Sequence, residues 1–473
     1  MELGEIKTIH FTGIKGVAMT ALACCAQDLG IKISGSDLAE IFVTDATLTK
    51  RGINWHSGFS DQHLPKNLDL LVYTGAFGCQ PNPEIAAAEK QGIPVLNHAQ
   101  ALALFTQDKT LISVAGVGGK STVSAMLATV FDTAGVRPSF SVGVSDIPCL
   151  DAPGRYVNNS RFFIAEADEY IACKKRDDQP RFWYQRPELA IITNIEFDHP
   201  DVYADFEQTK TAFAQFTASI SEQGLLVACA DSRKVKDFLK KVEKPVQTYG
   251  FSEKVDWQII DWQQGEQFQS FSVAQGGGVF GPVKLGVPGR FNGLNATATL
   301  AAATFFGLGF KQIQSGLKRF TGTKRRFELI KATADYILYD DYAHHPREIE
   351  VTLKAAKHWL ADYKIMVIFQ PHTYSRTRVL FKEFSQSFSL ADQVILVPIY
   401  ASAREKPDPQ TSSYQLYQQI AQLHRQAFYV KDKASLTRLL TKTLQPKTAI
   451  LTLGAGDIFL WHPEIIKTLT ALS

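Results

Sequence analysis

A glycine-rich segment near residue 116 contains the residue types that bind phosphate. The sequence GVGGKST occupies residues 116–122 and follows an apolar run that starts at Thr110. Backbone amides in such a turn can surround phosphate oxygens, while a lysine neutralises phosphate charge and a hydroxyl coordinates Mg²⁺. Val114 stands where the standard P-loop motif has its first glycine. The segment therefore predicts a shorter P-loop variant, with an ordinary glycine turn before a helix as the alternative.

Polar residues follow two later apolar runs. Glu166 and Asp168 come directly after the run at 162–165, and His199 lies after the run at 189–192. Taken singly, each acidic residue is more simply a helix cap. Open α/β sheets, however, bind ligands outside the carboxyl ends of their strands, and hard cations take oxygen ligands. Together with the end of the run before the glycine-rich segment, these make three such strand ends, and they predict a site for a nucleotide and a metal.

The bulk composition limits the possible partners. The chain has 473 residues, more than one hydrophobic core usually serves, so we expect more than one domain. Hydrophobic residues are 45% and charged residues 21% of the chain, which argues against long disorder. With 50 basic and 47 acidic residues, the net charge of +3 favours neither nucleic acid nor an anionic membrane. Any site that binds an anion must therefore depend on a local group of charges and not on the net charge.

The sequence gives no indication of export or membrane insertion. The N-terminus enters a strand-like run at 7–12 without the pattern of a signal peptide. The most apolar long stretch, 294–310, contains Asn295 and several threonines, so we predict a buried helix instead of a membrane span. The cysteines show no CxxC pair and are expected to be buried, reduced thiols: Cys24, Cys25, Cys79, Cys149, Cys173 and Cys229. We therefore predict a cytoplasmic protein.

Strand-like and helix-like stretches alternate along the chain, which predicts an α/β fold. Strands are expected at 7–12, 68–73, 93–96, 336–339, 365–369, 394–398 and 449–453, with a helix at 82–91. The sequence GTKRR at 322–326 is short, basic and glycine-containing, as a hinge would be. We predict three domains, at 1–107, 108–321 and 322–473.

Segments along almost the whole chain resemble the Mur ligase superfamily, in the family's order. They are HFTGIKGVAM (10–19), GSD (35–37), NPEI (82–85), GVGGKST (116–122), EADE (166–169), TNIEFDH (193–199), GRFNGLNA (289–296), KRRFE (324–328), DDYAHHP (340–346), FQPHTYSRTR (369–378) and GAGDI (454–458). The last three of these segments resemble most closely the branch of the superfamily that adds L-alanine.

The resemblance implies an N-terminal Rossmann-like domain for a UDP-sugar, a central P-loop ATPase-type domain and a C-terminal Rossmann-like domain for the amino acid. It also implies the chemistry. ATP, with Mg²⁺, would phosphorylate the carboxylate of UDP-N-acetylmuramate, and the amine of L-alanine would attack the acyl phosphate. Phosphorylation supplies the leaving group that a carboxylate lacks. Both a monomer and a homodimer are compatible with the resemblance.

The same resemblance assigns roles to residues. Lys120, Glu166, His199, His344 and Arg376 are expected to be catalytic, and Ser121, Glu166 and His199 to hold the metal. ATP is expected to contact Gly116, Gly118, Gly119, Lys120, Ser121, Thr122, Asn292, Asn295 and Arg326. The substrates are expected to contact Gly13, Lys15, Gly16, Asp37, Tyr342, His345 and His372, with Asp341 in the same site. For His344 and His345, capping or loop packing is an equal alternative.

The chain departs from the family pattern at several positions. Lys15 and Ala18 stand where the family usually has glycine, so either bulk displaces the diphosphate or the ammonium pairs with it. Val117 and Gly118 replace a usual Thr-His pair, and we expect ATP binding to persist. Ala214 stands where several relatives carry a carbamylated lysine, so no such lysine is predicted.

Three alternatives remain open from the sequence. One is a ligase that attaches a recycled tripeptide to the same UDP-sugar. Another is a nucleotide-dependent oxidoreductase, suggested by the first glycine turn and Asp37, although the chain has no GxGxxG motif there. The third is a non-catalytic relative that serves as a binding protein, which the retention of Lys120, Glu166 and His199 opposes.

Overall fold

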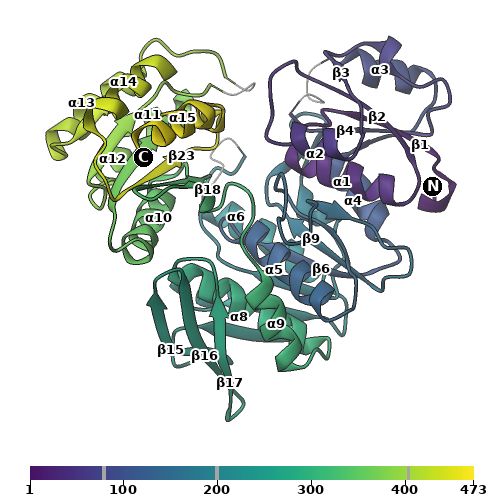
Figure 1. Cartoon of the computed structure of the whole chain (residues 1–473). Coiled ribbons are helices and arrows are strands. Elements are labelled where there is room, and N and C mark those ends of the chain that lie inside the picture. Colours follow the sequence, from purple (N-terminus) through teal and green to yellow (C-terminus); the bar gives the residue numbers. More distant parts are fainter. Residues whose placement is uncertain (77–80, 198–201, 402–404) are drawn as a thin grey trace. The chain divides into compact units, whose positions relative to one another are not determined.

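The computed structural model describes residues 1–76, 81–197, 202–401 and 405–473 (Figure 1). They form two compact units. The first comprises Met1–Trp262, Ser270–Leu285 and Phe291–Thr323, and the second comprises Gln263–Gln269, Gly286–Arg290 and Lys324–Ser473. Among the described helices, none combines the length and apolar character needed to cross a bilayer.

A parallel sheet opens the first unit. Its order is β3 (His56–Ser57), β2 (Lys32–Asp37), β1 (Thr8–Thr12), β4 (Leu70–Tyr73) and β5 (Val95–Asn97). The accompanying helices are α1 (Val17–Asp28), α2 (Asp45–Lys50), α3 (Pro83–Lys90) and α4 (His98–Thr106). Because β1 and β2 are parallel neighbours, the turns after Thr12 and Asp37 emerge at the same edge of the sheet.

A second, larger sheet carries the glycine-rich segment. Its order is β17 (Gly278–Leu285), β16 (Phe268–Gln275), β15 (Trp257–Gly265), β14 (Val246–Gly250), β13 (Leu225–Cys229), β12 (Leu189–Ile192), β6 (Thr110–Ala115), β9 (Phe162–Ala167), β7 (Ser139–Ser141) and β8 (Gly154–Arg155). β6 lies between β9 and β12, and both pairings are parallel. The strand ends that carry the predicted ATP and metal residues therefore lie side by side.

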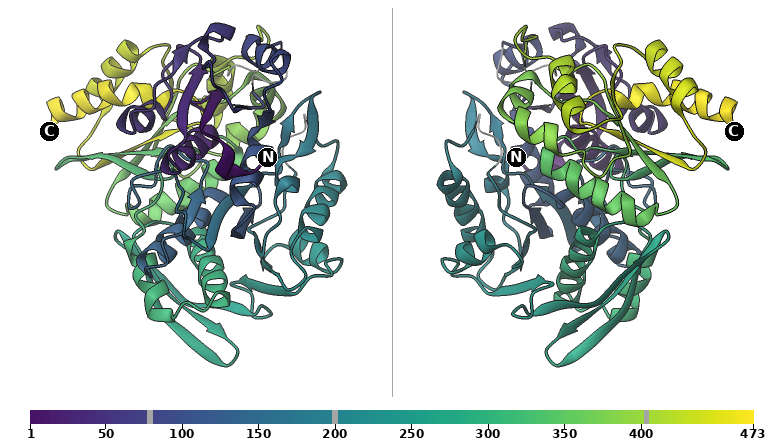
Figure 2. Two further views of the ribbon diagram at one scale, coloured as in Figure 1. Left: turned by 90° about the vertical axis from the view of Figure 1, so that its right-hand side faces the viewer. Right: turned by 90° about the vertical axis from the view of Figure 1, so that its left-hand side faces the viewer.

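Helices accompany this sheet. They are α5 (Lys120–Thr133), α6 (Phe206–Ala218), α7 (Arg233–Leu239), α8 (Arg290–Phe305) and α9 (Phe310–Arg319). α9 packs against α5 and β17, and the long strands β15 to β17 are visible beside it (Figure 2). The predicted buried helix corresponds to α8, most of whose residues are buried. A small separate hairpin is formed by β10 (Ile171–Cys173) and β11 (Asp177–Pro180).

The second unit holds a sheet of its own. Its order is β18 (Glu328–Ala332), β19 (Tyr336–Asp341), β23 (Thr448–Leu453), β20 (Lys364–Phe369), β21 (Gln393–Leu396) and β22 (Ala427–Tyr429); β18 is antiparallel to β19 and the rest are parallel. Its helices are α10 (Pro346–Trp359), α11 (Tyr374–Val379), α12 (Phe381–Gln386), α13 (Ser413–Leu423), α14 (Lys433–Thr443) and α15 (His462–Leu472).

The α/β prediction is confirmed, and each predicted strand and the helix at 82–91 coincide with an observed element to within a few residues. The strands β14 to β17 were not predicted. The sequence does contain a signal for β16 and β17, because a triple glycine at 276–278 separates two alternating runs, as expected for a hairpin turn.

Candidate functional site

The turn between β6 and α5 requires glycine for steric reasons. Gly116 and Gly119 both have positive φ angles, 124° and 93°. A Cβ at Gly116 would lie 2.2 Å from the Thr193 hydroxyl, and one at Gly119 would lie 2.9 Å from Asn295 Oδ1. Side chains at these positions would collide with the residues that follow β12 and with Asn295 of α8. We call residues 116–122 the glycine loop.

The end of β12 holds the glycine loop in place. The Gly118 amide donates to Asn194 Oδ1 at 3.1 Å, and Asn194 Nδ2 donates back to the Gly118 carbonyl at 2.8 Å. The Thr193 hydroxyl donates to the same carbonyl at 2.6 Å. Because these bonds use the carbonyl and the amide of Gly118, the turn keeps its shape through side chains of the neighbouring strand end.

Lys120 begins α5 and pairs with a carboxylate. Its Nζ lies 3.0 Å from Glu169 Oε2, and the two side chains are 15% and 2% exposed. Burial disfavours the ammonium, but the charges of Glu169, Asp168 and Glu166 outweigh it and raise the pKa of Lys120 above its usual value. The lysine is therefore charged and directed to the strand end that carries the acidic motif.

Ser121, in the first turn of α5, lies near Glu166 on β9. The Ser121 hydroxyl acts to lower the pKa of the Glu166 carboxyl, and the Gly143 amide donates to Glu166 Oε1 at 2.8 Å. Burial nevertheless raises the pKa of Glu166. A buried hydroxyl–carboxylate pair whose charge is under-compensated fits a hard divalent cation such as Mg²⁺. Among the described residues, no group of three or more His, Cys, Asp or Glu is arranged to hold a metal ion by itself, and His199 lies outside the described residues.

The predicted adenine contacts come from α8. Asn292 and Asn295 are both buried, and Asn295 Nδ2 donates to Asn292 Oδ1 at 3.0 Å. Asn295 also borders Gly119 of the glycine loop. Thr122 lies in the first turn of α5 and is partly exposed. The first unit therefore brings the predicted loop, metal and adenine residues together, apart from His199.

In the turn after β1, the charged side chains are buried within the protein. Gly13 has a φ of 85°, and Gly16 precedes α1 as its N-cap. The Asp37 carboxylate accepts the backbone amides of Lys15 and Leu38, at 2.7 and 2.8 Å. Asp37 is 1% exposed and Lys15 is 2% exposed. Both side chains are thus bound inside the protein, and the main chain of the turn is what remains for a ligand.

Most of the predicted amino-acid residues gather in the second unit, after β19 and β20. The imidazole–arginine cluster consists of Tyr342, His344, His372, Arg376 and Tyr400. The His344 ring lies 5.2 Å from the Tyr342 ring and 5.8 Å from the His372 ring, and His372 stacks on Tyr400 at 5.8 Å. Arg376 Nη1 lies 3.4 Å from His372 Nδ1. These residues form one contiguous polar and aromatic group.

The charge balance of this cluster is positive. Burial lowers the pKa of His344, and the cations Arg376 and Arg326 lower it further against the opposing carboxylate of Glu348. The Arg326 guanidinium lies 5.1 Å from the centre of the Tyr342 ring. A neutral imidazole beside two guanidinium groups suits a ligand that carries a carboxylate.

His345 and Asp341 have local structural partners. His345 is the N-cap of α10, and its Nδ1 accepts the Arg347 amide. Asp341 accepts the amides of Phe327 and Ala343, both at 2.8 Å. Burial raises the pKa of Asp341 to about 6, against the opposing effects of Arg326 and these amides. For His345 the structure therefore gives the capping arrangement that was the alternative to a substrate contact.

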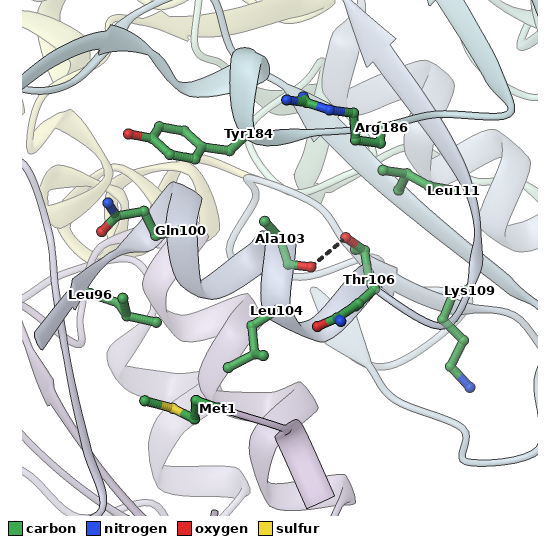
Figure 3. A pocket seen from close by; sticks show the side chains of 11 residues that line it. Met1, Leu96, Gln100, Ala103, Leu104, Thr106, Lys109, Leu111, Tyr184 and Arg186 are labelled. Atoms are coloured by element: carbon green, nitrogen blue, oxygen red, sulfur yellow. Dashed lines mark hydrogen bonds between the residues drawn. The ribbon is translucent and has the colours of Figure 1, made fainter. Parts of the chain in front are cut away.

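A separate cavity of about 560 Å³ lies at the opposite end of β6 (Figure 3). It is lined by Met1, Leu96, Gln100, Ala103, Leu104, Thr106, Gln107, Lys109, Leu111, Tyr184 and Arg186. Lys109 donates to the carbonyls of Val157, Asn158 and Ser160, and Arg186 donates to those of Trp183 and Gln185. The cavity is not part of the glycine-loop site.

Comparison with protein-family models accounts for most of the chain. Residues 8–110 match the Mur ligase family catalytic domain, residues 114–303 the Mur ligase middle domain and residues 325–456 the Mur ligase glutamate ligase domain. The chain belongs to the Mur ligase family.

Individual relatives match this Mur ligase over almost its full length. The UDP-N-acetylmuramate--L-alanine ligase of Carboxydothermus hydrogenoformans is 37% identical over 96% of this chain and 95% of its own. The enzyme of the same name from Acetivibrio thermocellus is 36% identical over 97% of this chain and 95% of its own. The crystal structure of the UDP-N-acetylmuramate-alanine ligase of Thermotoga maritima has a TM-score of 0.83 at 26% identity, covering 98% of this chain and 100% of its own.

A solved murein peptide ligase is also similar. The structure from Psychrobacter arcticus has a TM-score of 0.72 at 25% identity and covers 98% of both chains. The fold of this Mur ligase therefore resembles both kinds of ligase, with the higher TM-score for the alanine enzyme.

Several residues of this Mur ligase make contacts near the two sites that the sequence analysis did not predict. Glu169 was quoted only as part of a motif, yet it is the partner of Lys120. Glu348 accepts the amides of His344 and His345, and Arg325 pairs with buried Asp340 at 3.0 Å. Glu348 had a detectable signal, since an acidic residue three positions after an N-cap forms a capping box. The other two depend on contacts between distant segments.

Proposed function

We propose that this chain joins L-alanine to the carboxylate of UDP-N-acetylmuramate with consumption of ATP. The observation that carries the proposal is the similarity, over almost the full length of the chain, to ligases of that name. The reaction is proposed to take place in the cytoplasm. The alternatives of an oxidoreductase and of a silent binding protein have no comparable support.

The chemistry follows from the reactivity of a carboxylate. An oxygen of the muramoyl carboxylate would attack the γ-phosphorus of ATP, forming an acyl phosphate and releasing ADP. The free amine of L-alanine would then attack the acyl carbon, so that a C–N bond forms, the C–O bond to phosphate breaks and inorganic phosphate leaves. The amine gives up a proton in this step. The enzyme has mainly to position the reactants and to neutralise phosphate charge.

In the first unit the proposed roles divide between the glycine loop and its surroundings. The loop amides and Lys120 would bind the phosphates of ATP, and Asn292 and Asn295 would contact the adenine. Ser121 and Glu166, with His199, would hold Mg²⁺, which supplies charge neutralisation at the phosphates when bound. Support comes from the position of the Ser121 hydroxyl near the Glu166 carboxylate and from the raised pKa of Glu166.

In the second unit Arg376 is the proposed partner of the alanine carboxylate, because a guanidinium offers a two-point match to that group. Its neighbour His372 and the rings of Tyr342 and His344 would line the amino-acid site. We retain 1–107, 108–321 and 322–473 as the proposed UDP-sugar, ATP and amino-acid domains.

The proposal is tested by phosphate release with UDP-N-acetylmuramate, ATP and one candidate amine at a time. We expect release to depend on L-alanine and to be slower with glycine, because one methyl group is worth roughly 1–3 kcal/mol in a small pocket. An alanyl-glutamyl-diaminopimelate tripeptide should give little release. A stronger response to the tripeptide would assign the chain to the recycling ligases, and ATP-independent behaviour would reject ligase chemistry.

A further inference from the structure

We infer that Lys15 is a positioning residue for the UDP-sugar: its buried ammonium fixes residues 38–45 against the turn 13–16. The inference rests on the proposed function, because it concerns the shape of the surface that would bind that substrate. It differs from a direct contact between Lys15 and the diphosphate, which was one expectation from the sequence.

The ammonium of Lys15 is surrounded by the segment that follows β2. Nζ donates to the carbonyl of Leu38 at 3.1 Å and to the carbonyl of Glu40, and it lies 3.3 Å from Asp45 Oδ1. The Lys15 side chain is 2% exposed and that of Asp45 is 23% exposed. These carbonyls and the carboxylate belong to one short stretch of chain, so a single ammonium draws the whole stretch together.

Two aromatic rings complete the environment of this ammonium. It lies 4.8 Å from the centre of the Phe42 ring and 5.6 Å from that of Trp55. A cation over ring faces is attracted to them, and more strongly where water is excluded. The side chain therefore points away from the open edge of the turn and toward the interior behind it.

Asp45 depends on this arrangement. Its Oδ1 is buried and accepts no hydrogen bond from the described residues, which leaves the Lys15 ammonium as its close ionic neighbour. Removal of the ammonium would leave a buried carboxylate oxygen without compensation, which is costly. The segment would be expected to rearrange so that Asp45 reaches water.

The main chain of Lys15 adds two further links. Its amide donates to Asp37 Oδ2 at 2.7 Å, and its carbonyl accepts the Thr44 hydroxyl at 2.5 Å. Thr44 is fully buried. Side chain and main chain of one residue thus join the turn after β1 to both ends of the segment after β2.

This junction lies where a ligand would be recognised. Parallel α/β sheets bind ligands outside the carboxyl ends of their strands, and β1 and β2 end at Thr12 and Asp37. Residues 38–45 therefore form one wall beside the turn 13–16. Displacing such a wall removes contacts with the ligand even when the displaced residue never touches it, and in catalysis a misplacement of about 1 Å can cost roughly 100-fold in rate.

The test measures binding to the full-length chain by calorimetry, with UDP-N-acetylmuramate and UDP as probes and ATP absent. We expect Lys15→Met to weaken both about 10- to 100-fold, and to leave the affinity for ADP within about twofold of wild type. Thr44→Val and Asp45→Asn disturb the same junction without removing the ammonium and should weaken the UDP probes in the same direction. Lys50→Met, in which an exposed lysine paired with Asp151 is lost, is the matched control and should bind normally.

Amide hydrogen exchange supplies a second readout. Lys15→Met should speed exchange at 38–45 and leave the glycine loop at its wild-type rate. If Lys15→Met fails to fold, Thr44→Val and Asp45→Asn decide the question. Unchanged UDP affinity in the folded Lys15 variant overturns the inference. Weak binding in that variant alone, with Thr44→Val and Asp45→Asn normal, also overturns it, because the ammonium would then act on the ligand directly. Wild-type protein that binds ADP but neither UDP probe would instead reject the proposed function.

Discussion

The glycine-loop site of the first unit and the imidazole–arginine cluster of the second carry opposite charge balances. At the glycine loop, one lysine faces the carboxylates of the segment 166–169, and burial still raises the pKa of Glu166. In the cluster, burial and the charges of Arg376 and Arg326 lower the pKa of His344, although the Glu348 carboxylate lies 3.4 Å from its ring. The first arrangement favours an added cation and the second an added anion. These two charge balances support the proposed binding of a metal-bound nucleotide by the first unit and of an amino-acid carboxylate by the second.

The two sites also differ in how they are held. The glycine loop is tied by the side chains of Thr193 and Asn194 on the adjacent strand end. In the cluster, the rings of His344, His372 and Tyr400 contact one another, and Glu348 accepts the amide of His344. We expect loss of Lys120 to reduce turnover, and loss of the Arg376 guanidinium to weaken the binding of a substrate.

Lys120→Ala should have the largest effect. The amides of the glycine loop remain in place, but the charge on the transferring phosphoryl group is unmatched, so the rate of phosphate release should fall roughly 10²- to 10³-fold. Lys240→Ala is the matched control, because Lys240 is 74% exposed and pairs only with helix neighbour Asp237 among the described residues. Near-normal turnover in Lys120→Ala would remove the glycine loop from the ATP site.

Arg376→Lys tests the second site. Lysine keeps the charge but loses the two-point match to a carboxylate, so the KM for L-alanine should rise about 10- to 100-fold while the KM for ATP changes little. Arg378→Lys, on the same helix, is the control, since Arg378 is 60% exposed and pairs with Asp408. An equal rise in both KM values would mean that Arg376 supports the fold instead of the amino acid.

The sequence was sufficient to predict the glycine loop and the strands around it. Each of the runs at 110–115, 162–165 and 189–192 is a short apolar stretch followed by a turn and polar residues, which is a local signal. They became the adjacent strands β6, β9 and β12. Their neighbourhood could be anticipated because parallel strands end at the same edge of a sheet.

The partners of individual side chains could not be predicted in the same way. Glu166 and Glu169 occur in one motif, but Glu169 follows the strand, where the alternation of side-chain direction no longer applies. Lys15 stands where the family usually has glycine, and the sequence left open whether it would displace the diphosphate or pair with it. Its actual partners lie more than twenty residues later in the chain, and only the folded segment 38–45 brings them near.

Asp341→Asn tests how an acid of the second unit with a raised pKa affects stability. Because the pKa of Asp341 is raised to about 6 from 3.8, the folded protein retains this proton while the unfolded chain releases it. The stability linked to this group is therefore full below about pH 4 and is lost as the pH rises to about 6, by on the order of 2 kcal/mol. The variant should lack this decline when thermal midpoints are recorded between pH 4 and 7. The exposed Asp362→Asn should retain it, and an unchanged profile in Asp341→Asn would contradict the assignment.

Glu84→Gln should show the opposite dependence of stability on pH. Glu84 is fully buried in the first unit, where it accepts the hydroxyls of Thr12 and Ser36 and lies 3.4 Å from His10 Nε2. Burial alone would raise its pKa, but hydrogen bonds from His10, Ser36 and Thr12 outweigh it and lower the pKa to about 2. The stability linked to Glu84 is therefore present above about pH 4.5 and is lost as the pH falls toward 2.

A neutral amide accepts these bonds less strongly than a carboxylate, so Glu84→Gln should lower the free energy of unfolding by about 1 kcal/mol at pH 7. The difference from wild type should shrink as the pH falls below about 4.5, because the wild-type carboxylate then becomes protonated in the unfolded chain first. Glu89→Gln, on the same helix but 50% exposed and paired with Arg176, is the control and should change stability less. If Glu84→Gln were as stable as wild type at pH 7, the hydrogen bonds to Glu84 would not stabilise its carboxylate. The contrast with Asp341, whose pKa is raised, would then be lost.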